Sequence, residues 1–237
     1  MAFGLSKNDS SVLAALFDPE SSLTSAVRIY GNTSTSQMPS KVKPLREQEV
    51  SALKAINHDQ PQPKEIELAV SRLTAIIEND PSYASAWNNR AQARRMLIAD
   101  EMLSRHPSTV AQIFADLAQA ISLTAPPTAN MTLSITDARI LASAHTHRGY
   151  LLLLASKSEE NRKMLANVPG LRDLPIRDLE EAASREFAKG GRYGNETARQ
   201  LAVKTNPYAK LCGSIVREAL TKEISGFCTP AEPWSRN

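Results

Sequence analysis

Cysteine, glycine and aromatic residues are scarce in this sequence, and each scarcity argues against a class of protein. Two cysteines among 237 residues, Cys212 and Cys228, cannot build a disulfide framework, and they lack the spacing of metal ligands. Nine glycines leave few tight turns for β-meanders, and an aromatic content of 5% leaves a mainly aliphatic core. Because 42% of the residues are still hydrophobic, we expect a core of helices packed on helices.

Charge of one sign and long apolar runs are missing as well. The net charge is only +3, and basic residues alternate with acidic ones, so no dense basic stripe for a phosphate backbone is present. The longest apolar cluster, Tyr150–Ala155, is too short to span a bilayer. The N-terminus lacks the pattern of a signal peptide, so a cytoplasmic protein without a membrane partner is expected, with the nucleus as the alternative.

Catalytic and metal-binding motifs are also absent. The sequence contains no glycine-rich phosphate loop, no GxSxG elbow and no HExxH helix. His145 and His147 are two positions apart on an expected helix, so they point to different faces and cannot share a metal ion. We therefore expect no catalytic residue, no metal and no cofactor.

The stretch Asn79–Arg95 shows how the chain is organised. Pro81 ends one helix, and the next helix carries the large Trp87 and, one turn later, the small Ala91. This order is typical of the junction between two tetratricopeptide repeats, although an ordinary amphipathic helix after a proline turn is the alternative.

Helical periodicity predicts a first helix pair from residue 45 to residue 80. Its first helix carries Val50, Leu53 and Ile56 on one face, and its second helix carries an apolar stripe between Ile66 and Ile77.

A second and a third pair follow. The second pair begins near Ala84 and ends with a helix over 110–123, which comes about ten residues late for the repeat period. We therefore expect its first helix to continue about two turns beyond Met96. The third pair begins near Ser134 and ends with a helix over 174–189, which the Gly-Gly pair at 190–191 should stop.

The predicted fold is all-α, a right-handed tetratricopeptide-repeat solenoid of three helix pairs plus a C-terminal capping helix near 208–224. Residues 1–43 are expected to form a short helix over Asn8–Phe17 and a flexible arm. Residues 44–226 form the repeat domain with its capping helices, and residues 227–237 form a loose tail. Val27, Ile29 and Tyr30 are candidates for attaching the arm to the body.

Four segments together resemble the tetratricopeptide repeat protein 36 family. They are NDSSVLAALFDPE (Asn8–Glu20), YASAWNNRAQARR (Tyr83–Arg95), DLAQAISL (Asp116–Leu123) and ARQLAVKTNPYAKLC (Ala198–Cys212). The resemblance implies a small non-enzymatic protein of three repeats. It also implies an association with a seventy-kilodalton heat-shock chaperone and with tyrosine catabolism.

The first helices of each pair line the groove of such a solenoid, so their polar side chains are the predicted partner-binding residues. These are Lys54, Asn88, Asn89, Gln92, Arg95, His147 and Tyr150. Arg90, Arg94 and Arg148 occupy inward positions and are expected to pair with Asp or Glu. We expect a monomeric, non-catalytic scaffold for protein–protein interaction. The alternatives are a nucleic-acid-associated helical module that uses those arginines and, less favoured, an undetected enzyme.

A chaperone clamp of this repeat class binds a C-terminal carboxylate with Lys and Asn residues and a final Lys–Arg pair. Here Lys54 and Asn89 match that pattern, whereas His58, Ser143 and His147 occupy the other positions. Neutral histidine cannot replace a bidentate arginine at pH 7, so weak or no binding of an acidic C-terminal peptide is expected.

Overall fold

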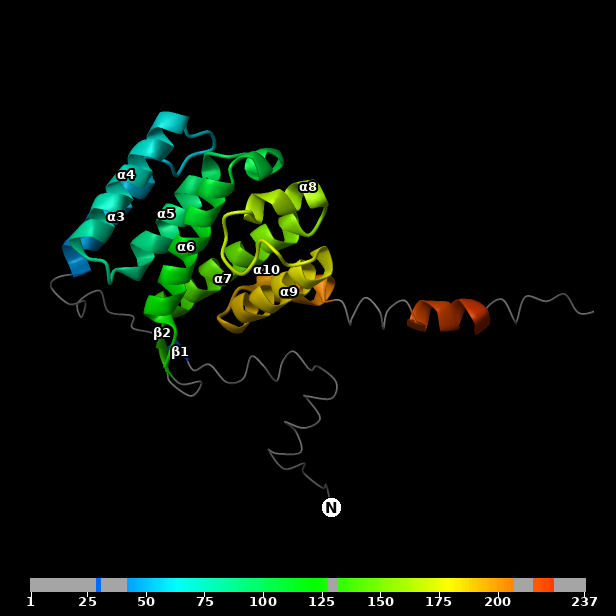
Figure 1. Ribbon diagram of the computed structural model, residues 1–237. Helices are drawn as coiled ribbons and strands as arrows, with labels where there is room; N and C mark the ends of the chain where they lie inside the picture. The colour runs from blue at the N-terminus through cyan, green and yellow to red at the C-terminus, as the bar shows by residue number, and fades with distance from the viewer. Residues whose placement is uncertain (1–28, 31–41, 128–131, 207–214, 224–237) are drawn as a thin grey trace, which may run out of the picture.

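The computed structural model describes residues 29–30, 42–127, 132–206 and 215–223 (Figure 1). In chain order the helices are α3 (Val42–Lys54), α4 (Pro63–Asn79), α5 (Ala84–Met96), the 3₁₀ helix η2 (Asp100–Arg105), α6 (Pro107–Thr124), α7 (Ile135–Ala155), α8 (Glu159–Arg162), the 3₁₀ helix η3 (Lys163–Leu165), α9 (Ile176–Arg192) and α10 (Glu196–Thr205). Residues 215–223 form a further helix. The predicted helix Asn8–Phe17, both cysteines, the tail 227–237 and most of the predicted arm lie outside the described residues.

Helices that follow one another in the chain pack against one another. α3 packs on α4, α4 on α5, α5 on α6, α6 on α7, α7 on α9, and α9 on α10, as the ordered row of helices in Figure 1 shows. This confirms the all-α prediction. In the part of the chain that the structure describes, no helix is both long and apolar enough to cross a membrane.

One short strand pair accompanies the helices. β1 (Ile29–Tyr30) runs parallel to β2 (Leu133–Ser134), which immediately precedes α7. Two of the three candidates for attaching the arm, Ile29 and Tyr30, therefore pair with the body, and the third, Val27, lies outside the described residues. A protein with no strand at all had been expected from the helical periods alone, and this pair is the difference.

The helix starts follow from local sequence. At α4, Gln62 and Glu65 form a reciprocal capping box and Pro63 takes the first position, where its missing N–H costs nothing. At α7, the Ser134 side chain accepts from the backbone N–H of Asp137, at 3.0 Å. At α10, Asn195 caps the helix in the same way through the backbone N–H of Ala198.

The buried apolar side chains fall into two main clusters. The N-terminal cluster lies between α3, α4 and α5 and includes Leu73 and Ala93, both fully buried. The larger cluster extends from α5 to α10 and includes Ala91 and Phe187. Helix α5 therefore contributes small residues to both clusters, since Ala91 faces one and Ala93 faces the other. The smallness of these alanines allows helices to approach α5 from both sides.

The predicted inner face of the first helix is wrong at Val50, whereas Ile56 is buried and Leu53 packs against the N-terminal cluster. Val50 is 56% exposed, and the buried residues of α3 are Leu45, Glu49 and Ala52. The helix turns a carboxylate inward at Glu49 because Tyr83 and Asn89 of the following repeat supply hydrogen bonds to it. The spacing of apolar residues cannot reveal a buried carboxylate that is stabilised by hydrogen bonds from a distant helix.

The extra residues of the second helix pair were expected to lengthen its first helix. They do not. α5 ends at Met96, and the additional segment forms η2, whose Leu103 is 1% exposed. In the third repeat the long hairpin contains α8 and η3, and it buries Met164 and Leu165. The two insertions contact each other, so each provides apolar cover for the other.

Gly190 and Gly191 do not stop α9, which continues to Arg192. A Cβ on Gly190 would lie 3.1 Å from the Ala198 Cβ, and one on Gly191 would lie 3.0 Å from the Arg199 Cα. The two glycines therefore permit close packing of α10, and the turn itself is made by Gly194, with φ of 101°.

The helix of residues 215–223 differs from its predicted capping role. All of its residues are exposed, including Ile215, Val216 and Leu220. Among the described helices, α10 is the one that covers the end of the row by packing on α9.

Candidate functional site

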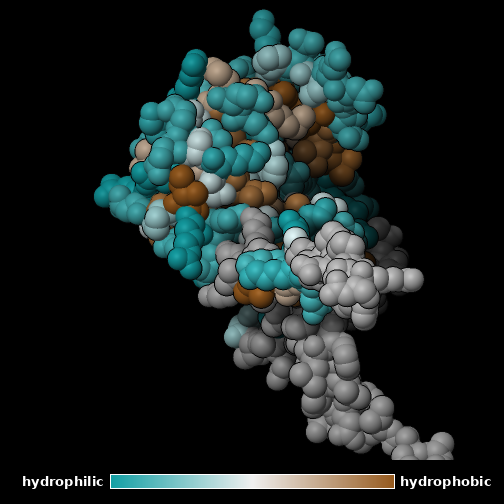
Figure 2. Space-filling model, turned by 90° about the vertical axis from the view of Figure 1, so that its right-hand side faces the viewer, coloured by the Kyte–Doolittle hydropathy of each residue, from teal (hydrophilic) through white to brown (hydrophobic). Residues whose placement is uncertain are grey.

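Two adjoining cavities lie along the helices α3, α5 and α7. The first, about 960 Å³, lies between α5, α7 and the start of α10, and the second, about 570 Å³, lies between α3, α5, the end of α6 and the start of α7. Gln92, Arg139 and Ser143 line both of them. We call the two together the groove. The face shown in Figure 2 is mostly hydrophilic and carries separate small hydrophobic patches.

A buried carboxylate organises the second cavity. Glu49 is 6% exposed, and its two oxygens accept hydrogen bonds of 2.8 Å from the Tyr83 hydroxyl and the Asn89 amide. Burial and the neighbouring Glu49 charge raise the pKa of Tyr83, so the phenol remains a donor. The Asn89 amide, which a chaperone clamp would use to bind the carboxylate of its ligand, therefore already donates to Glu49 of the same chain.

An insertion residue organises the first cavity. Asp100, at the start of η2, pairs with the Arg95 guanidinium and accepts a hydrogen bond from the Tyr150 hydroxyl. Arg95 also donates to the Ile98 carbonyl. Arg95 is thus held by its own chain, and Asp100 joins the ends of α5 and α7.

His147 lies beside Arg95 in this cavity and is neutral at physiological pH. Burial and the Arg95 charge lower the pKa of His147 to about 4. Its Nδ1 atom is buried and has no hydrogen-bond partner among the described residues. The cation that a clamp would place here is therefore absent from this position.

The depressed pKa of His147 makes the stability of the protein dependent on pH. The unfolded chain takes up this proton near pH 6.5 and the folded chain only near pH 4, so the free energy of unfolding falls as the pH falls through that window. Between pH 7 and pH 5 we expect wild type to lose about 1–2 kcal/mol more than His147→Gln. Urea unfolding at both pH values measures the difference, and equal losses in the two proteins would contradict it.

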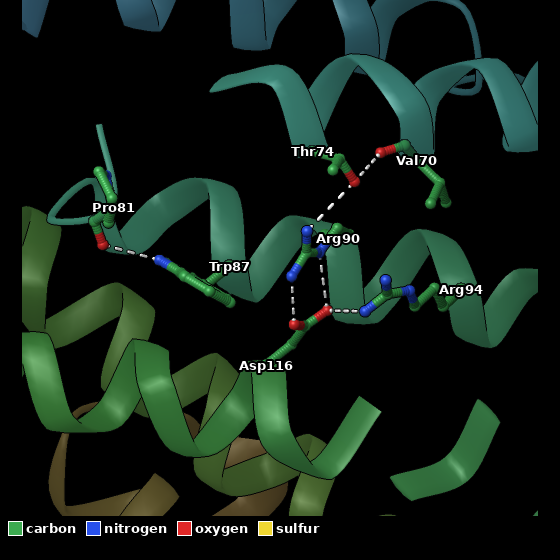
Figure 3. A network of polar contacts seen from close by, with 7 residues as sticks. All are labelled: Val70, Thr74, Pro81, Trp87, Arg90, Arg94 and Asp116. Atoms are coloured by element: carbon green, nitrogen blue, oxygen red, sulfur yellow. Dashed lines mark hydrogen bonds and ion pairs between the residues drawn. The ribbon is translucent and has the colours of Figure 1, made fainter. Parts of the chain in front are cut away.

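The inward arginines of α5 are paired, as expected. Arg90 makes a bidentate contact with Asp116 of α6 (3.0 and 2.7 Å), and Arg94 binds the same carboxylate (Figure 3). The Arg90 guanidinium also lies 4.9 Å from the ring centroid of Trp87. The Trp87 indole donates to the Pro81 carbonyl, which fixes the turn before α5. These arginines are structural.

A related arrangement occurs one repeat later. His145, which takes the place of Trp87, lies 2.8 Å from Glu186 of α9, and Arg148 lies 3.4 Å from the same carboxylate. Although burial raises the pKa of Glu186, the His145 hydrogen bond and the charges of Arg148, His145 and Lys189 lower it to about 2. Glu186 therefore remains ionised and joins α7 to α9.

The structure brings together six of the seven predicted partner-binding residues. Asn88 and Asn89 line the second cavity, Gln92 lines both, and Arg95, His147 and Tyr150 line the first. Lys54 is exposed at the end of α3 and lines neither cavity.

Sequence reasoning missed Glu49, Asp100 and Arg139. Arg139 is exposed, and no hydrogen bond or ion pair holds it in the described part of the chain. Its position on α7, one turn before Ser143, was the signal that could have revealed it. The described residues contain no group of three or more His, Cys, Asp or Glu side chains that could hold a metal ion.

The described residues form an all-helical body of consecutively packed helices with a polar groove, and comparison with known proteins identifies its family. The chain is 44% identical over 243 residues to the L-tyrosine degradation gene cluster protein hmgX of Aspergillus fumigatus, covering 94% of each protein. It is 28% identical to tetratricopeptide repeat protein 36 of Danio rerio (92% of this chain, 94% of that protein) and 27% identical to the Homo sapiens protein of that name (90% and 93%). The chain belongs to the tetratricopeptide repeat protein 36 family. No family model and no solved structure matches it.

Proposed function

We propose that this chain is a non-catalytic adaptor, a right-handed tetratricopeptide-repeat solenoid whose groove binds a segment of a partner protein. The observation that carries the proposal is the pair of adjoining cavities along α3, α5 and α7, which share Gln92, Arg139 and Ser143. In a solenoid of this kind the first helices of successive repeats form the binding surface. Cavities of 960 and 570 Å³ in line accommodate several side chains of an extended segment.

We further propose that the partner is a protein of L-tyrosine degradation. The support is the name of the Aspergillus fumigatus relative, which is 44% identical over nearly the whole chain. A nucleic-acid partner is less well supported, because Arg90, Arg94, Arg95 and Arg148 all engage acidic side chains within the chain.

The experiment uses Arg139, because it lines both cavities and makes no hydrogen bond or ion pair with the described residues. We expect Arg139→Glu to reduce recovery of the partner at least tenfold from extracts of cells grown on L-tyrosine, while the thermal midpoint changes little. Mass spectrometry identifies the recovered proteins, and nuclease treatment should leave the result unchanged. Gln112→Glu is the control, because Gln112 is exposed on α6 and lines neither cavity. Equal recovery with wild type and Arg139→Glu would remove the groove from the proposal.

A heat-shock chaperone of the seventy-kilodalton class is proposed as a partner only through another surface. In the clamp positions, Asn89 already binds Glu49, His58 lies 3.3 Å from Glu65, and His147 is neutral. A second carboxylate in the same place would meet the Glu49 charge in a partly dehydrated site.

We therefore expect an acidic C-terminal chaperone peptide to bind with a dissociation constant weaker than about 1 mM, a binding free energy smaller than about 4 kcal/mol. Fluorescence anisotropy with the labelled peptide measures this, and the amidated peptide is the control. Micromolar binding that requires the free carboxylate would contradict the expectation.

A further inference from the structure

We propose that the second cavity is a lysine-binding site, which takes the side chain of a lysine flanked by acidic residues in the partner segment. The inference rests on the proposed function only for the source of the lysine. The cavity's preference for a hydrogen-bond donor follows from its own side chains.

A chain of hydrogen bonds fixes the polarity of the cavity floor. Both Glu49 oxygens accept hydrogen bonds, and Asn89 turns its Nδ2 toward Oε1, at 2.8 Å. The remaining Asn89 Oδ1 accepts from the Asn88 Nδ2, at 3.2 Å. This leaves the Asn88 Oδ1 as the end of the chain, an acceptor without a partner among the described residues.

Asn88 is only 5% exposed and lines the cavity, but its Oδ1 atom is itself closed to solvent, so a ligand reaches it once the amide turns toward the cavity. Burying an acceptor without a donor is unfavourable, because the acceptor loses its hydrogen bond to water, and native structures rarely leave one without a reason. A ligand that brings an N–H into the cavity removes that cost. A carboxylate cannot, because it has no donor to offer and would face Glu49.

The charges of the lining select a primary amine. Glu49 is buried and Asp137 is partly buried, and the Asp137 Oδ2 accepts from the Ser134 hydroxyl, which leaves its other oxygen available. An ammonium group has three donors and no acceptor, which fits two carboxylates and the Asn88 carbonyl. The apolar stem of a lysine can lie against Leu123 and Ile140, which line the same cavity.

The exposed rim of the second cavity carries positive charge, whereas Glu49 and Asp137 are negative. Arg46 and Arg139 line the cavity and are exposed, whereas Glu49 and Asn88 are buried. A lysine that enters such a cavity places its neighbouring residues at the level of the arginines. Acidic neighbours are therefore favoured over basic ones, which defines a Glu-Lys-Glu type of segment as the ligand.

The test is a titration of the ¹⁵N-labelled protein with the peptide acetyl-Ala-Glu-Lys-Glu-Ala-amide, observed by NMR through the side-chain amide signals of Asn89 and Gln92, which line the same cavity. We expect saturable shifts with a dissociation constant on the order of 1 mM. The same peptide with norleucine in place of lysine should produce no such shifts. Asn88→Leu should weaken binding about tenfold, and the matched control Gln112→Leu should leave it unchanged.

A second variant covers the case in which Asn88→Leu does not fold. Asp137→Asn keeps the size of the side chain and removes one charge from the cavity. It should weaken binding of the lysine peptide at least threefold and leave unchanged the binding of the same peptide with glutamine in place of lysine. Equal binding of the norleucine peptide would overturn the site, and equal binding of the glutamine peptide would overturn its selection of a cation. If these titrations fail while partner recovery still depends on Arg139, the adaptor stands and the lysine site falls.

Discussion

Replacing Asp116 with alanine should lower the free energy of unfolding by about 3–5 kcal/mol. Asp116 is 2% exposed, and its carboxylate forms ion pairs with both Arg90 and Arg94. Its removal leaves two guanidinium groups between α5 and α6, of which Arg90 is only 8% exposed and cannot move into water without unpacking. Urea denaturation followed by circular dichroism measures the loss.

The matched control is Asp173→Ala, which removes the exposed ion pair with Arg172. Asp173 is 84% exposed, so the expected change is no more than about 0.5 kcal/mol. The comparison separates a buried charge network from a surface pair of the same residue types. A loss in Asp116→Ala as small as that of the control would show that the arginines find water or other partners without cost.

Truncating Phe187 should have a comparable effect, about 3–5 kcal/mol for Phe187→Ala. The ring is fully buried in the larger apolar cluster, and it lies against Gly149 of α7, where an added Cβ would be 2.8 Å from the Phe187 Cδ1. This is the packing contact between α7 and α9, and the alanine variant leaves a cavity there. Thermal and urea unfolding measure the loss.

The Gly149–Phe187 contact also makes a non-additive pair. In wild type, Gly149→Ala should cost about 1–3 kcal/mol, because the methyl group meets the ring. In the Phe187→Ala background the same change should stabilise the protein, since the methyl group fills part of the cavity and alanine is the better helix former. The same sign for Gly149→Ala in both backgrounds would contradict the close contact.

The helices could be predicted from the sequence because their starts and apolar stripes are local signals. Ile66, Leu73 and Ile77 on α4 are buried as their spacing indicated, and Ser134 caps α7. The glycines of α9 could not be placed in the same way, because glycine is ambiguous in sequence. It ends helices at some positions and permits close approach at others, and only the position of α10 decides between them.

The candidate site was predictable in its helices but not in its polarity. Asn88 and Asn89 were identified from the repeat register, and both line the groove. Glu49 decides what those amides can bind, yet it lies 40 residues from Asn89, and a lone glutamate on an amphipathic helix reads as a solvated residue. Its burial depends on the Tyr83 hydroxyl, which is a tertiary contact without a local signature.

The strand pair between Ile29–Tyr30 and Leu133–Ser134 constrains the order in which the chain assembles during synthesis. A ribosome that adds about 5–20 residues per second needs about 5–20 s to produce the roughly one hundred residues between the two strands. By the end of that interval the residues of helices α3 to α6 have all been made, while β1 still has no partner. In the nascent chain β1 therefore stays unpaired while these four α-helices are synthesised. The strand pair forms late, after β2 has left the ribosome.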